Sequence, residues 1–262
     1  MEGKPSNIEQ YKQWLKENHQ VDITNIVKNH YESVTDKMQQ QFQKSVFWRQ
    51  LGGNLHEYDA EYYLNTGYSL LQNTTLPDIL VKPFDSFLLK TFRKNILEND
   101  RFPESPMEGW ILPENWYLRI NDILRTCTVI KYLDGVEFMI GKIRSLCEKN
   151  GKDFECTFEA REVGYYAVHL YTKEEFEVPR IDWDTMKVET SIEIQLTTQL
   201  QEVIRKLLHK YYEEKRLSSI QSERMWQWDY RSDEFATNYL GHILHYIEGM
   251  IMEIREKGGQ YD

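Results

Sequence analysis

Two acidic residues lie beside strongly apolar segments, where a carboxylate needs a partner. Glu193 occupies an alternating position in SIEIQL, and Asp122 stands at the entrance to the apolar run ILRTCTVI. A buried carboxylate without a partner costs on the order of several kcal/mol, whereas carboxylates that act together with substrate phosphates are usual protein ligands of Mg²⁺. We therefore predict that Asp122 and Glu193 hold one Mg²⁺ ion between them. The alternative for Asp122 is that it caps a turn.

Basic residues in KPFDSFLLKTFRK are spaced to meet a polyphosphate. A helix over residues 85–97, capped by Asp85 or Ser86, would place polar residues on one face and apolar residues on the other. Several fixed cations are what a triphosphate needs, so we predict an anion-binding face, with an ordinary solvated surface as the alternative. The residues of this predicted face are Lys82, Ser86, Lys90 and Arg93.

The segment REVGYYAVHLYT combines a tight turn with an aromatic residue and a histidine. Gly164 permits a close turn, and in the strand that follows it Tyr165 and His169 point to the same face. Tyr165 is either a core residue or a platform on which a base stacks, which would contribute about 1–3 kcal/mol. His169 is either a core histidine or a donor to phosphate.

A helix after Glu193 has an apolar face and a basic opposite face. Its apolar residues recur at helical spacing, and His209 projects away from them. We predict that the basic face receives phosphate groups; a solvated face with Glu202–Lys206 pairing is the alternative. The cations that flank His209 are Arg205, Lys206 and Lys210.

Strands that alternate with helices predict a mixed α/β (α+β) sheet flanked by helices. Residues 1–75 are predicted as a helical N-terminal region, with helical spacing over 22–46 and again after a break at Gly52-Gly53. The core is predicted over residues 76–217, where NTTLPDILVKP is a loop, RFPESPMEGWILPENW ends a helix, and a further helix lies near 135–149. Its strands are expected in RTCTVIKYL, FECTFEA, YYAVHLYTKEEFEV and SIEIQL.

Residues 218–262 are predicted as a C-terminal helical extension that packs on the core. One long helix is expected in SDEFATNYLGHILHYIEGMIMEIREK because apolar residues recur there at helical spacing. The residues of this predicted packing face are Phe235, Tyr239, Ile243, Ile247, Met250 and Ile254.

Composition excludes several classes of protein. The 262 residues are 40% hydrophobic with a net charge of −10, which argues against a protein that coats nucleic acid or anionic membranes non-specifically. No run approaches the roughly 20 apolar residues of a membrane span, and the N-terminus lacks the apolar segment of a signal peptide. Cys127, Cys147 and Cys156 fit neither zinc spacing nor a disulfide framework. We expect reduced thiols, no metal–thiolate site and a cytoplasmic location.

The order of these segments resembles the synthetase domain of the RelA/SpoT family, which transfers pyrophosphate from ATP to a 3′-hydroxyl. The likeness covers roughly residues 77–216. The family's ATP segment Lys-x-x-x-Ser-x-x-x-Lys, its Mg²⁺-binding Asp, its Gly-Tyr-x-x-x-His loop, its Glu-Ile-Gln strand and the His-Lys of its small members all have counterparts. The matching positions are Lys82, Ser86, Lys90, Asp122, Gly164, Tyr165, His169, Glu193, Ile194, Gln195, His209 and Lys210.

The resemblance implies a nucleotidyltransferase-like synthetase core with ATP as donor and Mg²⁺ as cofactor. Asp122 and Glu193 would be catalytic, and Tyr165 would stack on the base of the acceptor. Three departures from the family pattern, at Leu80, Arg125 and Thr197, leave recognition of the acceptor open. Residues implied in acceptor binding are Arg161, Tyr165, His169, Gln195, Arg205, Lys206, His209 and Lys210.

The flanking segments are similar to those of the toxic small alarmone synthetases, toxins of toxin–antitoxin or anti-phage modules. We do not expect a hydrolase domain in the first 75 residues. Several toxins of this group modify tRNA, so the resemblance implies that the acceptor is the tRNA CCA end and that a protein antitoxin is a partner. The alternatives are an alarmone synthetase that makes (p)ppGpp or ppApp from a free nucleotide, and an inactive nucleotide-binding module.

Overall fold

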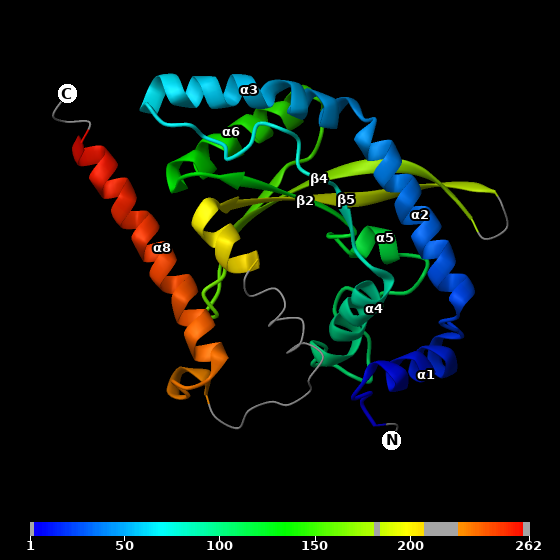
Figure 1. The fold of residues 1–262 in the computed structure, drawn as a ribbon. Coiled ribbons are helices and arrows are strands. Elements are labelled where there is room, and N and C mark those ends of the chain that lie inside the picture. The colour runs from blue at the N-terminus through cyan, green and yellow to red at the C-terminus, as the bar shows by residue number, and fades with distance from the viewer. Residues whose placement is uncertain (1–2, 181–183, 207–224, 259–262) are drawn as a thin grey trace. The chain divides into compact units, whose positions relative to one another are not determined.

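The computed structural model describes residues 3–180, 184–206 and 225–258, and in these it shows helices around a mixed five-stranded sheet (Figure 1). This confirms the predicted fold class. The order of strands across the sheet is β1-β2-β5-β4-β3, and β1 runs antiparallel to β2. The strands are β1 Leu80–Val81, β2 Leu124–Ile130, β3 Glu155–Ala160, β4 Tyr166–Pro179 and β5 Thr185–Thr198.

The longer strands lie where the alternation of apolar residues predicted them, with one change of length. β5 begins at Thr185, six residues before the segment SIEIQL. Its first half alternates between exposed and half-buried residues, so it offers little apolar signal. β1 was not predicted, because two residues in a segment with loop composition show no periodicity.

The chain divides into two compact units, and β2, β4 and β5 contribute residues to both. The first unit comprises Met1–Trp48, Ile79–Thr126 and Tyr171–Glu193. The second comprises Arg49–Asp78, Cys127–Leu170 and Ile194–Asp262. The domain boundaries at residues 75 and 217 remain predictions.

Helix α2 supports the first unit. It runs over Asn25–Gln43 as predicted, starts at the N-cap Thr24, and buries an aromatic and aliphatic face. Within that face, the ring of Tyr31 lies 4.6 Å from Phe87, and its hydroxyl donates to the carbonyl of Lys82 at 2.9 Å. The other helices of this unit are α1 Ile8–His19, α4 Phe84–Phe92, the π-helix η1 Arg93–Leu97 and α5 Trp116–Arg119.

Helix α3, Val46–Thr66, runs without interruption through Gly52 and Gly53, so the predicted break there is wrong. A Cβ atom on Gly52 would lie only 2.5 Å from the side chain of Leu76. The glycine therefore serves close packing against Leu76 inside a helix rather than ending one. The helix also stops at Thr66, short of the predicted segment's end, and Leu71 instead forms an isolated bridge with Ile130.

Three helices of the second unit meet at one polar cluster. Asp134, at the start of α6 (Leu133–Lys149), accepts from the hydroxyl of Tyr62 on α3 at 2.8 Å. Arg255, on α8 (Asp233–Gly258), lies 3.0 Å from Asp134, and its guanidinium carbon lies 4.1 Å from the ring centre of Tyr68 and 4.3 Å from that of Tyr132. Figure 1 shows α3 and α6 side by side, with α8 as the last helix of the chain. The short helix η2 spans Trp226–Trp228, and residues 199–206 are helical.

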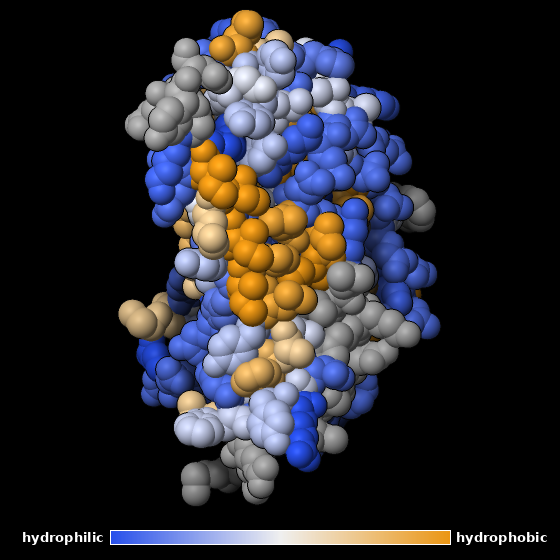
Figure 2. Space-filling view, turned by 60° about the vertical axis from the view of Figure 1, so that its left-hand side comes forward, coloured by the Kyte–Doolittle hydropathy of each residue, from blue (hydrophilic) through white to orange (hydrophobic). Residues whose placement is uncertain are grey.

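Helix α8 has the predicted extent, but the face that was expected to pack is largely exposed. Ile243 is 52% exposed and Ile254 is 66% exposed. Figure 2 shows an apolar patch on the side of the molecule that carries α8. The face of α8 that packs instead carries polar or small residues. Asn238, Gly241 and Glu248 on this face are buried. Among the described residues, no helix is long and apolar enough to span a membrane.

Candidate functional site

Asp122 lies between two lysines in the first unit. The Nζ atom of Lys82 is 2.8 Å from one carboxylate oxygen of Asp122, and the Nζ atom of Lys90 is 2.9 Å from the other. The side chains of Asp122 and Lys82 are each 13% exposed. The structure thus joins a predicted metal ligand to two residues of the predicted anion-binding face. We call these three residues the donor cluster.

The pairing of β1 with β2 builds this cluster. Val81 lies opposite Leu124, and the next amide, that of Lys82, donates to the carbonyl of Ile123 at 2.9 Å. Because of this register, Lys82 lies beside Asp122, the residue that precedes Ile123. Lys90 then arrives from α4, whose buried face contains Phe87 and Leu88. Both lysines are therefore fixed by elements that pack in the same unit.

Neighbouring charges govern the ionisation of Asp122 in the donor cluster. Burial opposes ionisation of Asp122, but the attraction of Lys90 and Lys82 outweighs it and lowers the pKa of this carboxyl to about 2. Burial lowers the pKa of Lys82, and Asp122 counteracts that effect. Asp122 is consequently an anion throughout the physiological pH range.

Further cations surround the donor cluster, and the sequence motifs did not identify them. The positive charge of Arg125 helps to lower the pKa of Lys82. The positive charges of Lys90 and Arg119 do the same for Lys94. Burial lowers the pKa of Lys94, with its basic neighbours adding to the effect. Arg125 had appeared only as a departure from a family pattern. Lys94 follows Lys90 by four residues, so the same helical spacing would have found it.

The helical segment predicted over residues 85–97 is confirmed as α4 followed by η1, but the predicted cap and the regular α-helical spacing are wrong. It starts at Phe84 after Pro83, with no side-chain cap from Asp85 or Ser86. After Phe92 the backbone becomes the π-helix η1, whose wider turn ends the spacing that placed Arg93 with Lys90. Arg93 instead pairs with Glu98 at 2.5 Å, and both side chains are at least half exposed. Ser86 is exposed.

Glu193 lies on β5, next to β2 in the sheet, and its residue is only 5% exposed. It stands within the strand, at a position of the predicted segment SIEIQL. The hydroxyl of Tyr171 donates to its carboxylate at 3.4 Å. Glu193 belongs to the same unit as the donor cluster.

The predicted acceptor loop, residues 161–166, lies in the second unit. Gly164 adopts a φ of 72°, the left-handed conformation that favours glycine, and its amide donates to the carbonyl of Arg161 at 2.9 Å. The hydroxyl of Tyr165 lies 3.1 Å from Nε2 of His169, and the guanidinium of Arg161 lies 5.4 Å from the Tyr165 ring. The three predicted acceptor-binding residues of this segment are therefore neighbours.

The basic helix is partly neutralised by its own carboxylate. Glu202 lies 2.6 Å from Nε of Arg205 and 3.3 Å from Nζ of Lys206. Burial opposes ionisation of Glu202, but its hydrogen bond to Arg205 lowers its pKa. Gln195, on β5, is half-buried. His209 and Lys210 lie outside the described residues.

The donor set of the first unit fits Mg²⁺, although it is small. Asp122 and Glu193 offer hard carboxylate oxygens, and Mg²⁺ commonly takes one or two carboxylates together with substrate phosphates. Within the described parts of the chain, no group of three or more His, Cys, Asp or Glu side chains could hold a metal ion. These two residues would therefore need the oxygens of a bound phosphate to complete a site.

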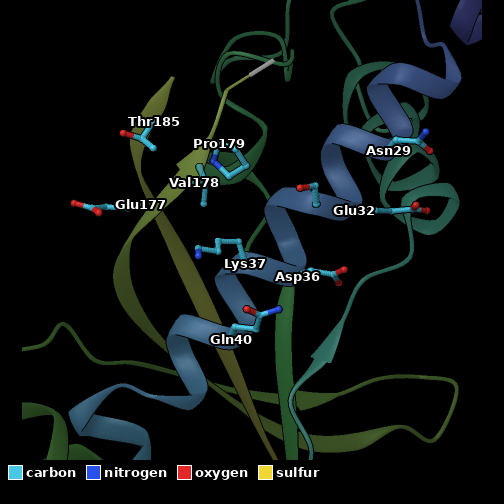
Figure 3. Close-up of a pocket in the computed structure, with 10 residues that line it drawn as sticks. Asn29, Glu32, Asp36, Lys37, Gln40, Glu177, Val178, Pro179 and Thr185 are labelled. Carbon is cyan, nitrogen blue, oxygen red and sulfur yellow. The ribbon is translucent and has the colours of Figure 1, made fainter. Parts of the chain in front are cut away.

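An open pocket of about 690 Å³ lies elsewhere in the first unit (Figure 3). Residues of α2 face the ends of β4 and β5 across it, with Lys37 among Glu32, Asp36 and Glu177. None of the predicted site residues lines this pocket. Its acidic side chains make it a poor place for a polyphosphate, so we assign the candidate site to the donor cluster.

No protein-family model matches the chain, and no curated protein sequence matches it either. Among solved structures, the chain is similar to small alarmone synthetase 2 from Bacillus subtilis, with 15% identity and a TM-score of 0.49 over 87% of this chain and 97% of that chain. It is similar to small alarmone synthetase 1 from Bacillus subtilis bound to its product pppGpp, with 16% identity and a TM-score of 0.49 over 86% of this chain and 100% of that chain. A GTP pyrophosphokinase family protein from Streptococcus pneumoniae matches with 12% identity and a TM-score of 0.47 over 90% of this chain and 95% of that chain.

Proposed function

We propose that this chain is an ATP-dependent pyrophosphokinase, and that it acts as the toxin of a toxin–antitoxin or anti-phage module. In this proposal the acceptor is the 3′-hydroxyl of the tRNA CCA end. A pyrophosphorylated end cannot be aminoacylated, so translation stops. A cytoplasmic location and a protein antitoxin as partner are part of the same proposal.

The donor cluster is the observation that carries the proposed chemistry. A protein with a net charge of −10 gathers Lys82 and Lys90 on one carboxylate, with the charges of Arg125 and Lys94 nearby. A triphosphate needs several fixed donors. When ATP binds, its phosphates can replace Asp122 as the ion-pair partners of Lys82 and Lys90. The carboxylate oxygens of Asp122 would then be free to bind Mg²⁺.

Each role in the proposed transfer is assigned to a residue with suitable chemistry. Lys82 and Lys90 hold the phosphates of ATP, while Asp122 and Glu193 would hold Mg²⁺, whose charge would offset that of the phosphates. Glu193 also accepts the proton of the attacking hydroxyl. The hydroxyl oxygen forms a bond to the β-phosphorus, the bond between that phosphorus and the α,β-bridging oxygen breaks, and AMP leaves. Positioning and charge neutralisation account for most of such catalysis.

The acceptor side of the proposal rests on Tyr165, which stacks on the terminal base, with Arg161, His169 and Gln195 around the acceptor. The resemblance to tRNA-modifying toxins favours tRNA. Arg161, paired with Glu159, and Arg205 and Lys206, paired with Glu202, would contact phosphates of the acceptor stem. The predicted His209 and Lys210 would extend this group of cations.

One observation favours a second candidate, an alarmone synthetase that uses a free nucleotide. Glu202 pairs with both Arg205 and Lys206, so only one positive charge remains in excess among these three residues. A weak basic strip suits a small acceptor better than a long anion.

Labelled transfer tests both candidates. The protein is incubated with ATP labelled in its β- and γ-phosphates and, separately, with bulk tRNA, GDP, GTP or AMP, with Mg²⁺ present. Label on tRNA supports the toxin. Label on a 3′-diphosphate nucleotide with tRNA untouched, namely ppGpp from GDP, pppGpp from GTP or pApp from AMP, supports the alarmone synthetase. Label on no acceptor, from folded protein that binds ATP, would contradict transfer and leave the inactive nucleotide-binding module.

A further inference from the structure

Helix α8 touches the acceptor loop backbone to backbone. A Cβ atom on Gly241 would lie 2.1 Å from the carbonyl oxygen of Gly164, and a Cβ atom on Gly164 would lie 2.2 Å from the carbonyl oxygen of Asn238. Real Cβ atoms do not approach other atoms so closely, so both positions require glycine. Because Gly164 also has a φ of 72°, the turn before Tyr165 is fixed by its own conformation and by the helix against it.

His242, the next residue of α8, clamps the same loop from two sides. Its Nε2 atom lies 2.8 Å from the carbonyl oxygen of Glu162, and its Nδ1 atom lies 2.8 Å from the hydroxyl of Tyr166. A carbonyl can only accept, so Nε2 carries the proton and donates. In the neutral ring Nδ1 then accepts from Tyr166, and both nitrogens are satisfied. Glu162 lies two residues before Gly164, and Tyr166 directly follows Tyr165, so the two partners flank the turn.

A second histidine of α8 extends the contact. The ring of His245 stacks on the ring of Tyr166 at 3.8 Å and 11° between planes. On its other side, Nδ1 of His245 lies 3.5 Å from the buried carboxylate of Glu248. Gln201, from the basic helix, donates to the carbonyl of Gly241 at 3.3 Å. The contact is therefore built from specific polar groups on the face of α8 opposite to its exposed apolar stripe.

We propose that α8 sets the position of the acceptor-stacking tyrosine, with Gly241 and His242 as positioning residues for Tyr165. The inference rests on the proposed function, because it assigns α8 to the acceptor half of that function. Tyr165 is half-buried and directly follows Gly164, so the backbone that α8 holds on either side of it helps to set the direction of its side chain. Neither Gly241 nor His242 needs to touch a substrate.

Two glycines of α8 give a matched pair for the test. Gly241→Ala places a methyl group against the loop, whereas Gly249→Ala, eight residues on in the same helix, meets nothing within 4 Å. For Gly241→Ala we expect kcat/KM for the acceptor to fall about tenfold or more through a raised acceptor KM, with the KM for ATP unchanged. Gly249→Ala should leave both constants at the wild-type level. Equal losses for ATP and acceptor, or no loss, would overturn the inference.

His242 gives an independent pair. His242→Leu removes both hydrogen bonds at similar volume, and we expect about a tenfold loss in acceptor kcat/KM, which corresponds to about 1.4 kcal/mol. His242→Gln can donate and accept at two neighbouring atoms and should recover to within about threefold of wild type. If His242 only stabilised the fold, His242→Leu would lower the melting temperature, and the KM for ATP and kcat/KM for the acceptor would be affected alike.

Hydrogen exchange separates this inference from the proposed function. In Gly241→Ala and His242→Leu, amides of residues 159–168 should exchange faster than in wild type, while those of α6 should not change. This result supports the loop contact even if no acceptor is ever labelled, which would refute only the function. Unchanged exchange in residues 159–168 of the folded variants would overturn the inference whether or not the enzyme is active.

Discussion

The donor cluster and the acceptor loop hold their key residues by different physical means. In the donor cluster, Asp122 is fixed by two ammonium groups at 2.8 and 2.9 Å, so charge determines the arrangement. In the acceptor loop, Tyr165 follows a glycine packed against the backbone of another helix, so shape determines it. A neutral residue of the same shape should therefore disable the donor cluster, whereas one added methyl group should disturb the loop.

The largest expected effect is the loss of charge at Asp122. Asp122→Asn keeps the shape but removes the ligand charge, and Glu193→Gln does the same on β5. We expect each to lower pyrophosphate transfer by about a thousandfold or more. Asp85→Asn, an exposed carboxylate of α4 at 86% side-chain exposure, is the matched control and should keep full activity. Steady-state transfer with circular dichroism as a folding check would decide; near-native activity in a folded Asp122→Asn protein would remove the two-carboxylate site.

A smaller effect is expected at Tyr165, which is positioned by packing and not by charge. Loss of about 1–3 kcal/mol of stacking in Tyr165→Ala corresponds to a drop of about 5- to 150-fold in kcat/KM for the acceptor. Tyr165→Phe keeps the ring but loses the hydroxyl contact with His169 at 3.1 Å, so we expect a mild loss of about fivefold. If the two variants lose activity equally, the hydroxyl and not the stacking surface matters.

Acid should weaken the donor cluster through protonation of Asp122. The folded-state pKa of Asp122 is about 2, below its ordinary value of 3.8, so the stabilisation is complete above about pH 4 and disappears as the pH falls towards 2. The difference corresponds to about 2 kcal/mol in the free energy of unfolding. Denaturant unfolding of wild type and Asp122→Asn from pH 7 to pH 2 should show curves that converge at low pH; a constant separation would mean that the ion pairs do not stabilise the fold.

The smallest effect is expected at Arg93, which the helical spacing had grouped with Lys90. Because η1 turns Arg93 towards Glu98, Arg93→Gln should change the Kd for ATP by less than about threefold, whereas Lys90→Gln should weaken it by tenfold or more. Calorimetric titration with a non-hydrolysable ATP analogue would measure both. Equal losses would restore Arg93 to the anion-binding face.

Local patterns predicted much of this molecule, and the failures have a common cause. Alternation of apolar residues located the longer strands, and helical spacing located α2. Both patterns depend only on which residues of the segment itself are buried. The pairing of Lys82 with Asp122 depends on the register of β1 with β2, which joins residues 40 positions apart. Gly52 was misread because its meaning depends on Leu76. The apolar stripe of α8 was visible, but the sequence did not show that the opposite face would pack.

The contact between Gly164 and Gly241 also has a consequence for the time at which activity can arise. A chain is made from its N-terminus, so the donor cluster and the acceptor loop are both synthesised before α8. Until Gly241 and His242 emerge from the ribosome, the loop lacks the surface against which it is shaped. A nascent chain would thus carry Lys82, Lys90 and Asp122 while the turn at Gly164 still lacked the helix against which it packs, so this turn would reach its final shape only after α8 is made.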